Sequence, residues 1–263
     1  MKQYPIGIFD SGIGGTSIWK AIVNLLPMED TIYLADSYYA PYGKRSKDEI
    51  IALSVKNTEK LIRLGAKMIV VACNTATTNA IEHLRMSYNI PFIGIEPAIK
   101  PAALRTKTKS IGVLATKGTL SSELFAKTSN KYSDTIQIHE IIGSGLVELI
   151  ENGDIYSSEM KSLLRSYTDS FIKKDIDYLV LGCTHYPYLI PQLSKLLPSN
   201  IEIIDSGEAV ARQTKTVLNE LGLASDSRLE PRTYQFYTNG TIEPLKQVLA
   251  PYIEKVSIAY LKF

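Results

Sequence analysis

The two cysteines of this chain, Cys73 and Cys183, stand in similar local sequences. Each follows an apolar segment and precedes a polar pair, which is Asn74-Thr75 after Cys73 and Thr184-His185 after Cys183. Ligands bind at the carboxyl ends of strands in an open α/β sheet, so each thiol is expected at the mouth of a binding site. The backbone N–H groups that follow would open a helix, bind an anion and lower the thiol pKa.

Two thiols that face each other across a cleft suggest inversion of a carbon stereocentre. One thiolate removes the α-proton and the opposite thiol returns one, while fixed groups hold the substrate's carboxylate and ammonium. Three other interpretations compete with this one. The cysteines could be small buried hydrophobic residues. They could form a redox dithiol, although Cys-x-x-Cys spacing is absent. They could bind zinc with His185, but this spacing is unusual for zinc and no fourth ligand is evident.

Further polar residues follow other predicted strands. The Gly-rich turn Asp10-Ser-Gly-Ile-Gly-Gly15 could cradle a carboxylate, with Asp10 orienting an ammonium. It fits neither the dinucleotide fingerprint nor the Walker pattern, and it could also be a tight turn that requires glycine. Pro41-Tyr-Gly43 forms a loop in which Tyr42 could close over a ligand or simply be exposed.

Three more side chains are candidates with a competing structural explanation. Thr116 and Thr119 follow a predicted strand and could bind a distal carboxylate or cap the next helix. Glu151 ends a predicted helix and could reach the site or remain solvated. His185 stands apart from His83 and His139, because only His185 has polar neighbours at a predicted strand end.

The elements that must position these residues alternate between short apolar strands and amphipathic helices. This alternation predicts an α/β fold with parallel sheets and helices on both faces. Ser46-Lys-Asp-Glu49 predicts a capping box for a helix that Gly65 ends, and Ser206 is a candidate cap for a later helix. The predicted strands are 6–9, 31–35, 67–72, 92–95, 110–115, 136–140, 178–182, 201–204, 233–237 and 256–260.

A faint internal repeat indicates two similar halves. Ile6-Gly-Ile-Phe-Asp-Ser-Gly12 resembles Ile111-Gly-Val-Leu-Ala-Thr-Lys117, and the segments around the two cysteines match at nearly the same offset. We therefore expect two pseudo-symmetric, doubly wound domains with the active site between them. The crossover is expected near Glu96-Pro97-Ala98. Residues 1–97 with 208–263 would form the first domain, and residues 98–207 the second.

Composition limits the class of protein. The 263 residues carry 29 Lys plus Arg against 27 Asp plus Glu, and this net charge of +2 gives no case for binding nucleic acid or an anionic membrane. The N-terminal residues resemble a strand and a turn rather than a signal peptide. The longest apolar stretches have strand length. A cytoplasmic protein with reduced thiols is expected.

The ordered set of motifs resembles the glutamate racemases of the cofactor-independent aspartate/glutamate racemase superfamily. The resemblance covers nearly the whole chain. Its motifs are Ile8-Phe-Asp-Ser-Gly-Ile-Gly-Gly15, Pro41-Tyr-Gly43, Ala72-Cys-Asn-Thr-Ala76, Gly94-Ile-Glu-Pro97, Leu181-Gly-Cys-Thr-His-Tyr-Pro187 and Ile204-Asp-Ser-Gly207.

This resemblance implies interconversion of L- and D-glutamate, with the D form used for peptidoglycan, and with neither a cofactor nor a metal. It implies that Cys73 deprotonates D-glutamate and Cys183 deprotonates L-glutamate, with Asp10 and His185 assisting. Glu151 maps to an auxiliary acidic position of some members. Homodimers are usual in the family. The substrate-binding positions implied are Asp10, Ser11, Pro41, Tyr42, Gly43, Asn74, Thr75, Thr116, Thr119, Thr184 and His185.

Two alternatives remain beside this resemblance. One is an aspartate or hydantoin racemase of the same superfamily, which a comparison of turnover on glutamate and on aspartate would distinguish from a glutamate racemase. A catalytically weak small-molecule-binding protein would bind glutamate without exchanging its α-proton. The residues alone lead only to acid/base chemistry by two thiols on a small carboxylate, and the substrate's identity comes from the resemblance.

Overall fold

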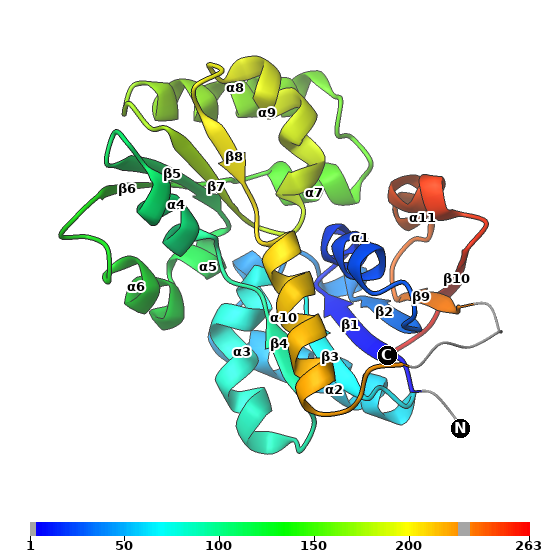
Figure 1. Cartoon of the computed structure of the whole chain (residues 1–263). Coiled ribbons are helices and arrows are strands. Elements are labelled where there is room, and N and C mark those ends of the chain that lie inside the picture. Colours follow the sequence, from blue (N-terminus) through cyan, green and yellow to red (C-terminus); the bar gives the residue numbers. More distant parts are fainter. Residues whose placement is uncertain (1–3, 226–231) are drawn as a thin grey trace.

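The computed structural model describes residues 4–225 and 232–263, which form two parallel sheets (Figure 1). The first sheet has the spatial order β10 (Val256–Tyr260), β9 (Tyr234–Thr238), β2 (Thr31–Ala35), β1 (Ile6–Asp10), β3 (Met68–Val71) and β4 (Phe92–Gly94). The second has the order β6 (Gln137–Ile142), β5 (Ser110–Ala115), β7 (Tyr178–Gly182) and β8 (Glu202–Ile204). All ten predicted strands are present within the described residues, with ends shifted by at most two positions.

Helices connect these strands. The α-helices are α1 (Thr16–Leu25), α2 (Lys47–Arg63), α3 (Asn74–Ser87), α4 (Ile99–Arg105), α5 (Lys117–Leu120), α6 (Glu123–Ser129), α7 (Leu146–Glu151), α8 (Ser158–Ile172), α9 (Ile190–Leu196), α10 (Gly207–Glu220) and α11 (Glu243–Leu249). Short 3-10 turns are η1 (Ser37–Tyr39), η2 (Tyr42–Lys44), η3 (Tyr186–Leu189) and η4 (Ala250–Tyr252).

The two sheets repeat one strand order. The four strands β2-β1-β3-β4 of the first sheet correspond in sequence order and pairing to β6-β5-β7-β8 of the second. The repeat in the sequence therefore reflects equivalent strands, since β1 corresponds to β5 and β3 to β7. The fold is α/β with two similar parallel sheets, as predicted. The domain limits given above stay a prediction.

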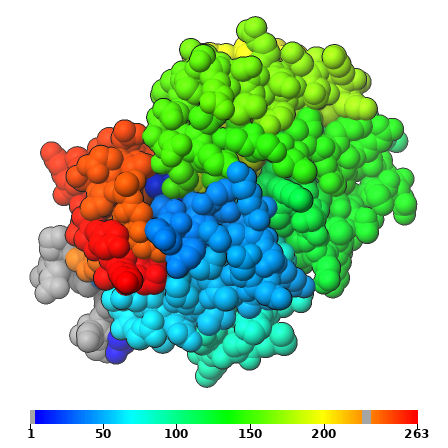
Figure 2. Space-filling model, turned by 180° about the vertical axis from the view of Figure 1, so that it is seen from behind, coloured from blue at the N-terminus to red at the C-terminus, as the bar shows by residue number. Residues whose placement is uncertain are grey.

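The core explains why the central strands are apolar throughout. Met68 and Val70 of β3 pack into a cluster that includes α1, whereas Ile69 and Val71 pack into a second cluster with α2 and α3. Successive side chains of a strand point to opposite faces, so helices on both faces require apolar residues at every position. The first cluster continues into the second sheet through α7 and α8. The two halves thus share buried contacts, and Figure 2 shows the blue and cyan first half directly against the green second half.

Two cap predictions had different outcomes. The capping box of Ser46 and Glu49 is confirmed at the start of α2, and Gly65 follows that helix in the left-handed region, with φ of 89°. Ser206 is the N-cap residue of α10, as predicted, but its side chain makes no capping hydrogen bond. Its hydroxyl donates instead to the carbonyl oxygen of Glu96 at 2.5 Å, and Asp205 accepts from the backbone N–H of Gly207 at 2.6 Å. The hydroxyl of Ser206 therefore joins the two connections between the sheets.

Within the ranges 4–225 and 232–263, no helix is both long and apolar enough to cross a membrane.

Candidate active site

A small cavity lies where the carboxyl ends of strands from both sheets meet. Cys73 lies two residues beyond β3, Cys183 directly follows β7, and Thr116 directly follows β5. The cavity measures about 10 Å³, which is the room of about one water molecule. Its lining consists of Ser11, Pro41, Tyr42, Gly43, Cys73, Asn74, Thr75, Thr116, Val147, Cys183, Thr184 and His185.

Cys73 is the N-cap of α3 and is 5% exposed. Its sulfur accepts from the backbone N–H of Ala76 at 3.4 Å, and its thiol donates to the hydroxyl of Ser11 at 3.7 Å. Burial raises the pKa of the thiol strongly, and the charge of Asp10 adds to this, while the Ala76 and Ser11 hydrogen bonds lower it. The expectation that the helix start would give Cys73 a low pKa is therefore wrong, because burial raises the pKa of the thiol by more than the two hydrogen bonds lower it.

Cys183 has a different neighbour. Its sulfur lies 3.7 Å from Nδ1 of His185, and the other ring nitrogen, Nε2, lies 2.5 Å from Oε1 of Glu151. Burial alone lowers the pKa of His185, but hydrogen bonds to Cys183 and Glu151 outweigh it and raise that pKa well above its usual value. An imidazolium held here stabilises negative charge on the sulfur of Cys183.

Glu151 connects this pair to the first half of the chain. Its Oε1 accepts from the backbone N–H of Ile13 at 2.7 Å, and its Oε2 accepts from the hydroxyl of Ser37 at 3.1 Å. The carboxylate therefore does not remain solvated. It contacts His185 and does not line the cavity, and its predicted auxiliary role stays a prediction.

The glycines of the turn after β1 allow this close approach. A Cβ on Gly12 would overlap the carboxylate of Glu151, and one on Gly14 would overlap the ring of His185. Neither glycine has a positive φ. The turn therefore requires glycine because the second half of the chain packs against it, and not because of its own backbone conformation.

Asp10 lies beneath the cavity and does not line it. Its Oδ1 accepts from the N–H of Gly12 at 2.8 Å and from the hydroxyl of Ser11 at 3.1 Å, while its Oδ2 accepts from the hydroxyl of Thr184 at 2.6 Å. Burial raises the pKa of Asp10. The carboxylate orients two cavity-lining hydroxyls from opposite halves, and its predicted contact with substrate stays a prediction.

Three threonine hydroxyls meet across the junction of the halves. Thr75 lies 2.8 Å from Thr116 and 3.2 Å from Thr119, and Thr116 lies 3.1 Å from Thr119. Thr116 caps α5, as one prediction held, and its side chain also lines the cavity. Thr119 is fully buried and does not line the cavity, and its predicted contact with substrate stays a prediction.

Asn74 is the polar side chain that lacks partners in the cavity wall. It is 2% exposed, and neither its Oδ1 nor its Nδ2 has a hydrogen-bond partner. A buried amide without partners costs free energy, and such groups in native proteins call for an explanation. A ligand carboxylate or ammonium in the cavity would satisfy it.

Two contributors were missed from the sequence. Val147 lines the cavity from α7, and Ser37 donates to Glu151. Val147 resembles any core residue of an amphipathic helix, and its position shortly after β6 was the one available signal. Ser37 also follows a strand end, two residues beyond β2, but a lone serine there is not distinctive.

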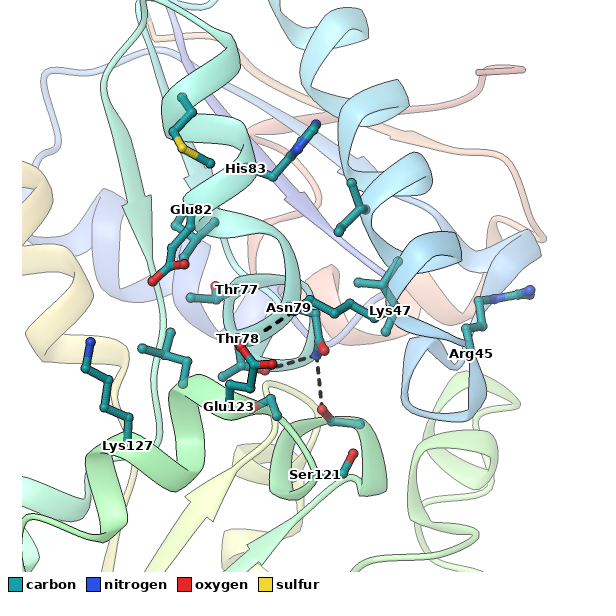
Figure 3. A pocket seen from close by; sticks show the side chains of 17 residues that line it. Arg45, Lys47, Thr77, Thr78, Asn79, Glu82, His83, Ser121, Glu123 and Lys127 are labelled. Atoms are coloured by element: carbon teal, nitrogen blue, oxygen red, sulfur yellow. Dashed lines mark hydrogen bonds and ion pairs between the residues drawn. The ribbon is translucent and has the colours of Figure 1, made fainter.

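A much larger hollow of about 550 Å³ lies outside this site, between α2, α3, α5 and α6 (Figure 3). Charged side chains surround it, including Arg45, Lys47 and Glu82, and Asn79 donates across it to the carbonyl oxygen of Gly118 at 3.0 Å. Neither thiol lines this hollow. Among the described residues, no group of three or more His, Cys, Asp or Glu side chains is arranged to hold a metal ion.

Comparison with known proteins identifies the family of this chain. The family model for Asp/Glu/Hydantoin racemase matches residues 6–214. A glutamate racemase of Herpetosiphon aurantiacus is 44% identical over 92% of this chain and 92% of its own length. The structure of Escherichia coli glutamate racemase in complex with L-glutamate and the activator UDP-MurNAc-ala is 32% identical, with a TM-score of 0.84 and coverage of 98% of both chains. That of the Francisella tularensis enzyme in complex with D-glutamate is 29% identical, with a TM-score of 0.83 and the same coverage. This chain therefore belongs to the Asp/Glu/Hydantoin racemase family, and its relatives over almost the entire length are glutamate racemases.

Proposed function

We propose that this chain interconverts L- and D-glutamate by proton exchange between the α-carbon and two thiols, Cys73 and Cys183. The observation that carries the proposal is that both thiols line one small cavity and come from opposite halves of the chain. A planar carbanion held between them can be protonated from either face. Because the relatives of this chain are glutamate racemases, glutamate is favoured over aspartate as the substrate. The D-glutamate formed would supply peptidoglycan synthesis.

The assignment of the two thiols follows their surroundings. Cys73 is a buried thiol whose pKa is raised by burial, which suits the group that donates a proton. Cys183 lies beside His185, whose raised pKa favours the imidazolium that stabilises a thiolate. L-glutamate would therefore lose its proton to Cys183 and receive one from Cys73, and D-glutamate would follow the reverse path.

The α-proton of an amino acid is far less acidic than a thiol, so the site must stabilise the carbanion. Burial removes water, and fixed donors then act more strongly on developing negative charge. The unpartnered amide of Asn74 can donate to the substrate's carboxylate, whereas the hydroxyls of Ser11 and Thr184, which donate to Asp10, can accept from its ammonium. Binding the carboxylate withdraws charge from the α-carbon and lowers the barrier.

The test is proton NMR of L-glutamate in D₂O with dialysed protein, alongside circular dichroism of the same sample. We expect loss of the α-proton signal together with loss of optical activity, and neither with Cys73→Ala or Cys183→Ala, which should remain folded. Near-normal turnover by either variant would refute the two-thiol mechanism. Tight binding of glutamate by the wild type with no exchange would instead favour a binding protein on this scaffold.

Two further expectations belong to this proposal. We expect a homodimer, which light scattering on a sizing column tests, and a monomer at working concentration would contradict it. We expect a cytoplasmic location, which fractionation of the source cells tests.

A further inference from the structure

Asp36 is a fully buried carboxylate that the proposed chemistry does not use. It directly follows β2, at the same carboxyl edge of the first sheet as Asp10 and Cys73. Its own N–H donates to the backbone carbonyl of Asp10 at 3.0 Å. The residue is therefore adjacent to the site, although it does not line the cavity.

Four side chains from three parts of the fold converge on this carboxylate. Nζ of Lys56, on α2, lies 2.8 Å from Oδ1 and 3.0 Å from Oδ2. Nδ2 of Asn57 donates to Oδ2 at 3.2 Å, and Nδ2 of Asn239, just beyond β9, donates to Oδ1 at 2.5 Å. The hydroxyl of Tyr42, in η2, donates to Oδ2. An ionised carboxylate can accept all of these bonds, so none of its capacity is left for solvent.

The bond to Tyr42 connects Asp36 to the cavity wall. Tyr42 is 1% exposed, and its hydroxyl also accepts from Asn57 at 3.0 Å. Tyr42 and Gly43 both line the cavity, and Gly43 packs so closely on Thr116 that a Cβ there would lie 2.9 Å from the Cβ of Thr116. The position of the tyrosine hydroxyl therefore determines where this part of the wall lies.

Asp36 also lies next to a second contact with the other half of the chain, the hydrogen bond from Ser37 to Glu151. Ser37 follows Asp36 directly and donates to Glu151, which holds His185. Asn239 binds both ends of this turn, because it donates to Asp36 and its Oδ1 accepts from the N–H of Tyr38 at 3.0 Å. The buried carboxylate of Asp36 thus holds residues 36–43 in place. Within this segment, Ser37 contacts Glu151, and residues 41–43 form one wall of the cavity.

A buried ion pair is by itself weak evidence of anything beyond structure. The chain offers a matched comparison, because Glu29 at the other end of β2 is 2% exposed and accepts from Lys67 at 2.6 Å. Glu29 also accepts from the N–H and the hydroxyl of Ser225 at 2.7 and 2.8 Å. The two carboxylates are alike in burial, and each pairs with a lysine and accepts further hydrogen bonds, but only Asp36 binds a cavity-lining side chain.

We propose that Asp36 is a positioning residue for substrate binding, acting through the hydroxyl of Tyr42 to hold Pro41-Tyr-Gly43 in its binding conformation. This inference rests on the proposed function, since it assigns Asp36 a role at the same cavity. Without the carboxylate the binding-competent loop is populated less, and the apparent affinity for glutamate falls by that fraction.

The experiment compares Asp36→Asn, Tyr42→Phe, the double variant and the control Glu29→Gln. A hydrogen bond to a charged group is strong enough that we expect KM for glutamate to rise about tenfold in Asp36→Asn, with a smaller change in kcat. Tyr42→Phe should raise KM similarly, and the double variant should add little, because both changes break one interaction. Glu29→Gln should lower the unfolding temperature about as much as Asp36→Asn does. It should leave KM within about twofold, since Glu29 touches no cavity residue.

Two results would overturn the inference. One is a KM in folded Asp36→Asn that matches that of Glu29→Gln, which would make the role structural. The other is full additivity of the Asp36→Asn and Tyr42→Phe effects. Tyr42→Phe keeps the buried ion pair and carries the test if Asp36→Asn does not fold. Calorimetric titration with glutamate gives the same comparison without turnover, so an absence of α-proton exchange in the wild type would refute the proposed function and leave this inference separately testable.

Discussion

Replacing Glu151 with glutamine tests the coupling between the two halves most directly. Glutamine has the shape of glutamate, and its Oε1 can still accept from Ile13 and from His185. The change therefore removes the negative charge and keeps the geometry. In the wild type this charge is one of the two hydrogen-bonded partners that raise the pKa of His185.

The size of the effect follows from the kind of bond lost. Hydrogen bonds to charged groups contribute about 1.5–3 kcal/mol, and this pair is nearly buried, with Glu151 at 13% and His185 at 1% side-chain exposure. Because 1.4 kcal/mol is a factor of ten, we expect kcat/KM to fall about 10- to 100-fold. The two enantiomers have equal free energies, so kcat/KM must fall equally in both directions.

The asymmetry should appear in isotope effects instead. His185 contacts Cys183 and not Cys73, so Glu151→Gln should slow the proton transfers at Cys183 alone. With α-deuterated substrates, the isotope effect on kcat/KM should rise for L-glutamate and fall for D-glutamate. The control is Glu148→Gln, on the same helix, whose carboxylate pairs with the exposed Lys44 at 2.5 Å and should leave both isotope effects unchanged.

The pH profile gives an independent check. A raised pKa keeps His185 protonated to higher pH, and activity that needs the imidazolium is lost as pH rises through that pKa. Removing the charge of Glu151 lowers the pKa of His185, so the alkaline limb of kcat/KM should move to lower pH. An unmoved alkaline limb with equal isotope effects in both directions would refute the role assigned to the Glu151–His185 pair.

The other predictions concern packing, acid stability and motion. Gly14→Ala should reduce turnover severely while the protein remains folded, because a Cβ would overlap the His185 ring; normal activity would contradict the close approach. Burial raises the pKa of Asp177, but hydrogen bonds from Thr106, Lys107 and Thr108 outweigh it and hold that pKa below its usual value. Asp177 thus stabilises the fold above its unfolded pKa of about 4, and this contribution is lost as pH falls. The melting temperature of Asp177→Asn should therefore depend less on pH between about pH 5 and pH 2. A slope equal to that of the wild type would refute this. A cavity of about 10 Å³ cannot admit glutamate, so small-angle scattering should give different dimensions with and without saturating substrate, and identical dimensions would exclude a large motion.

Much of the fold could be predicted because parallel strands buried on both faces are apolar at every position. The ranges 31–35, 110–115, 178–182 and 256–260 were predicted with their observed ends. Strand ends that depend on pairing were less accurate. The strand predicted to end at Glu140 continues to Ile142, because its pairing with β5 persists to Ala115, a contact that local composition does not encode.

The site divides in the same way. Cys73, Cys183 and their neighbours were predicted because a strand end is a local feature, and the strand order then brings those ends together. The contact between Glu151 and His185 depends on how one half packs against the other. The high pKa of the Cys73 thiol likewise arises from burial by distant residues, whereas the sequence showed only the helix start that would lower it.

The late return of the chain to its first sheet has a consequence during synthesis. Strand β2 pairs with β1 as soon as both have left the ribosome, but its other edge pairs with β9, whose Tyr234 lies opposite Thr31. The second sheet is made entirely within the interval between them. An unpaired edge invites pairing with other chains, so the nascent first sheet must wait with one edge open while the second is translated. Asn239, which holds Asp36, arrives later still. A ribosome-bound chain that has reached only β8 therefore has both thiols and the bond between Asp36 and Tyr42, but it lacks the hydrogen bonds of Asn239 to Asp36 and to the N–H of Tyr38.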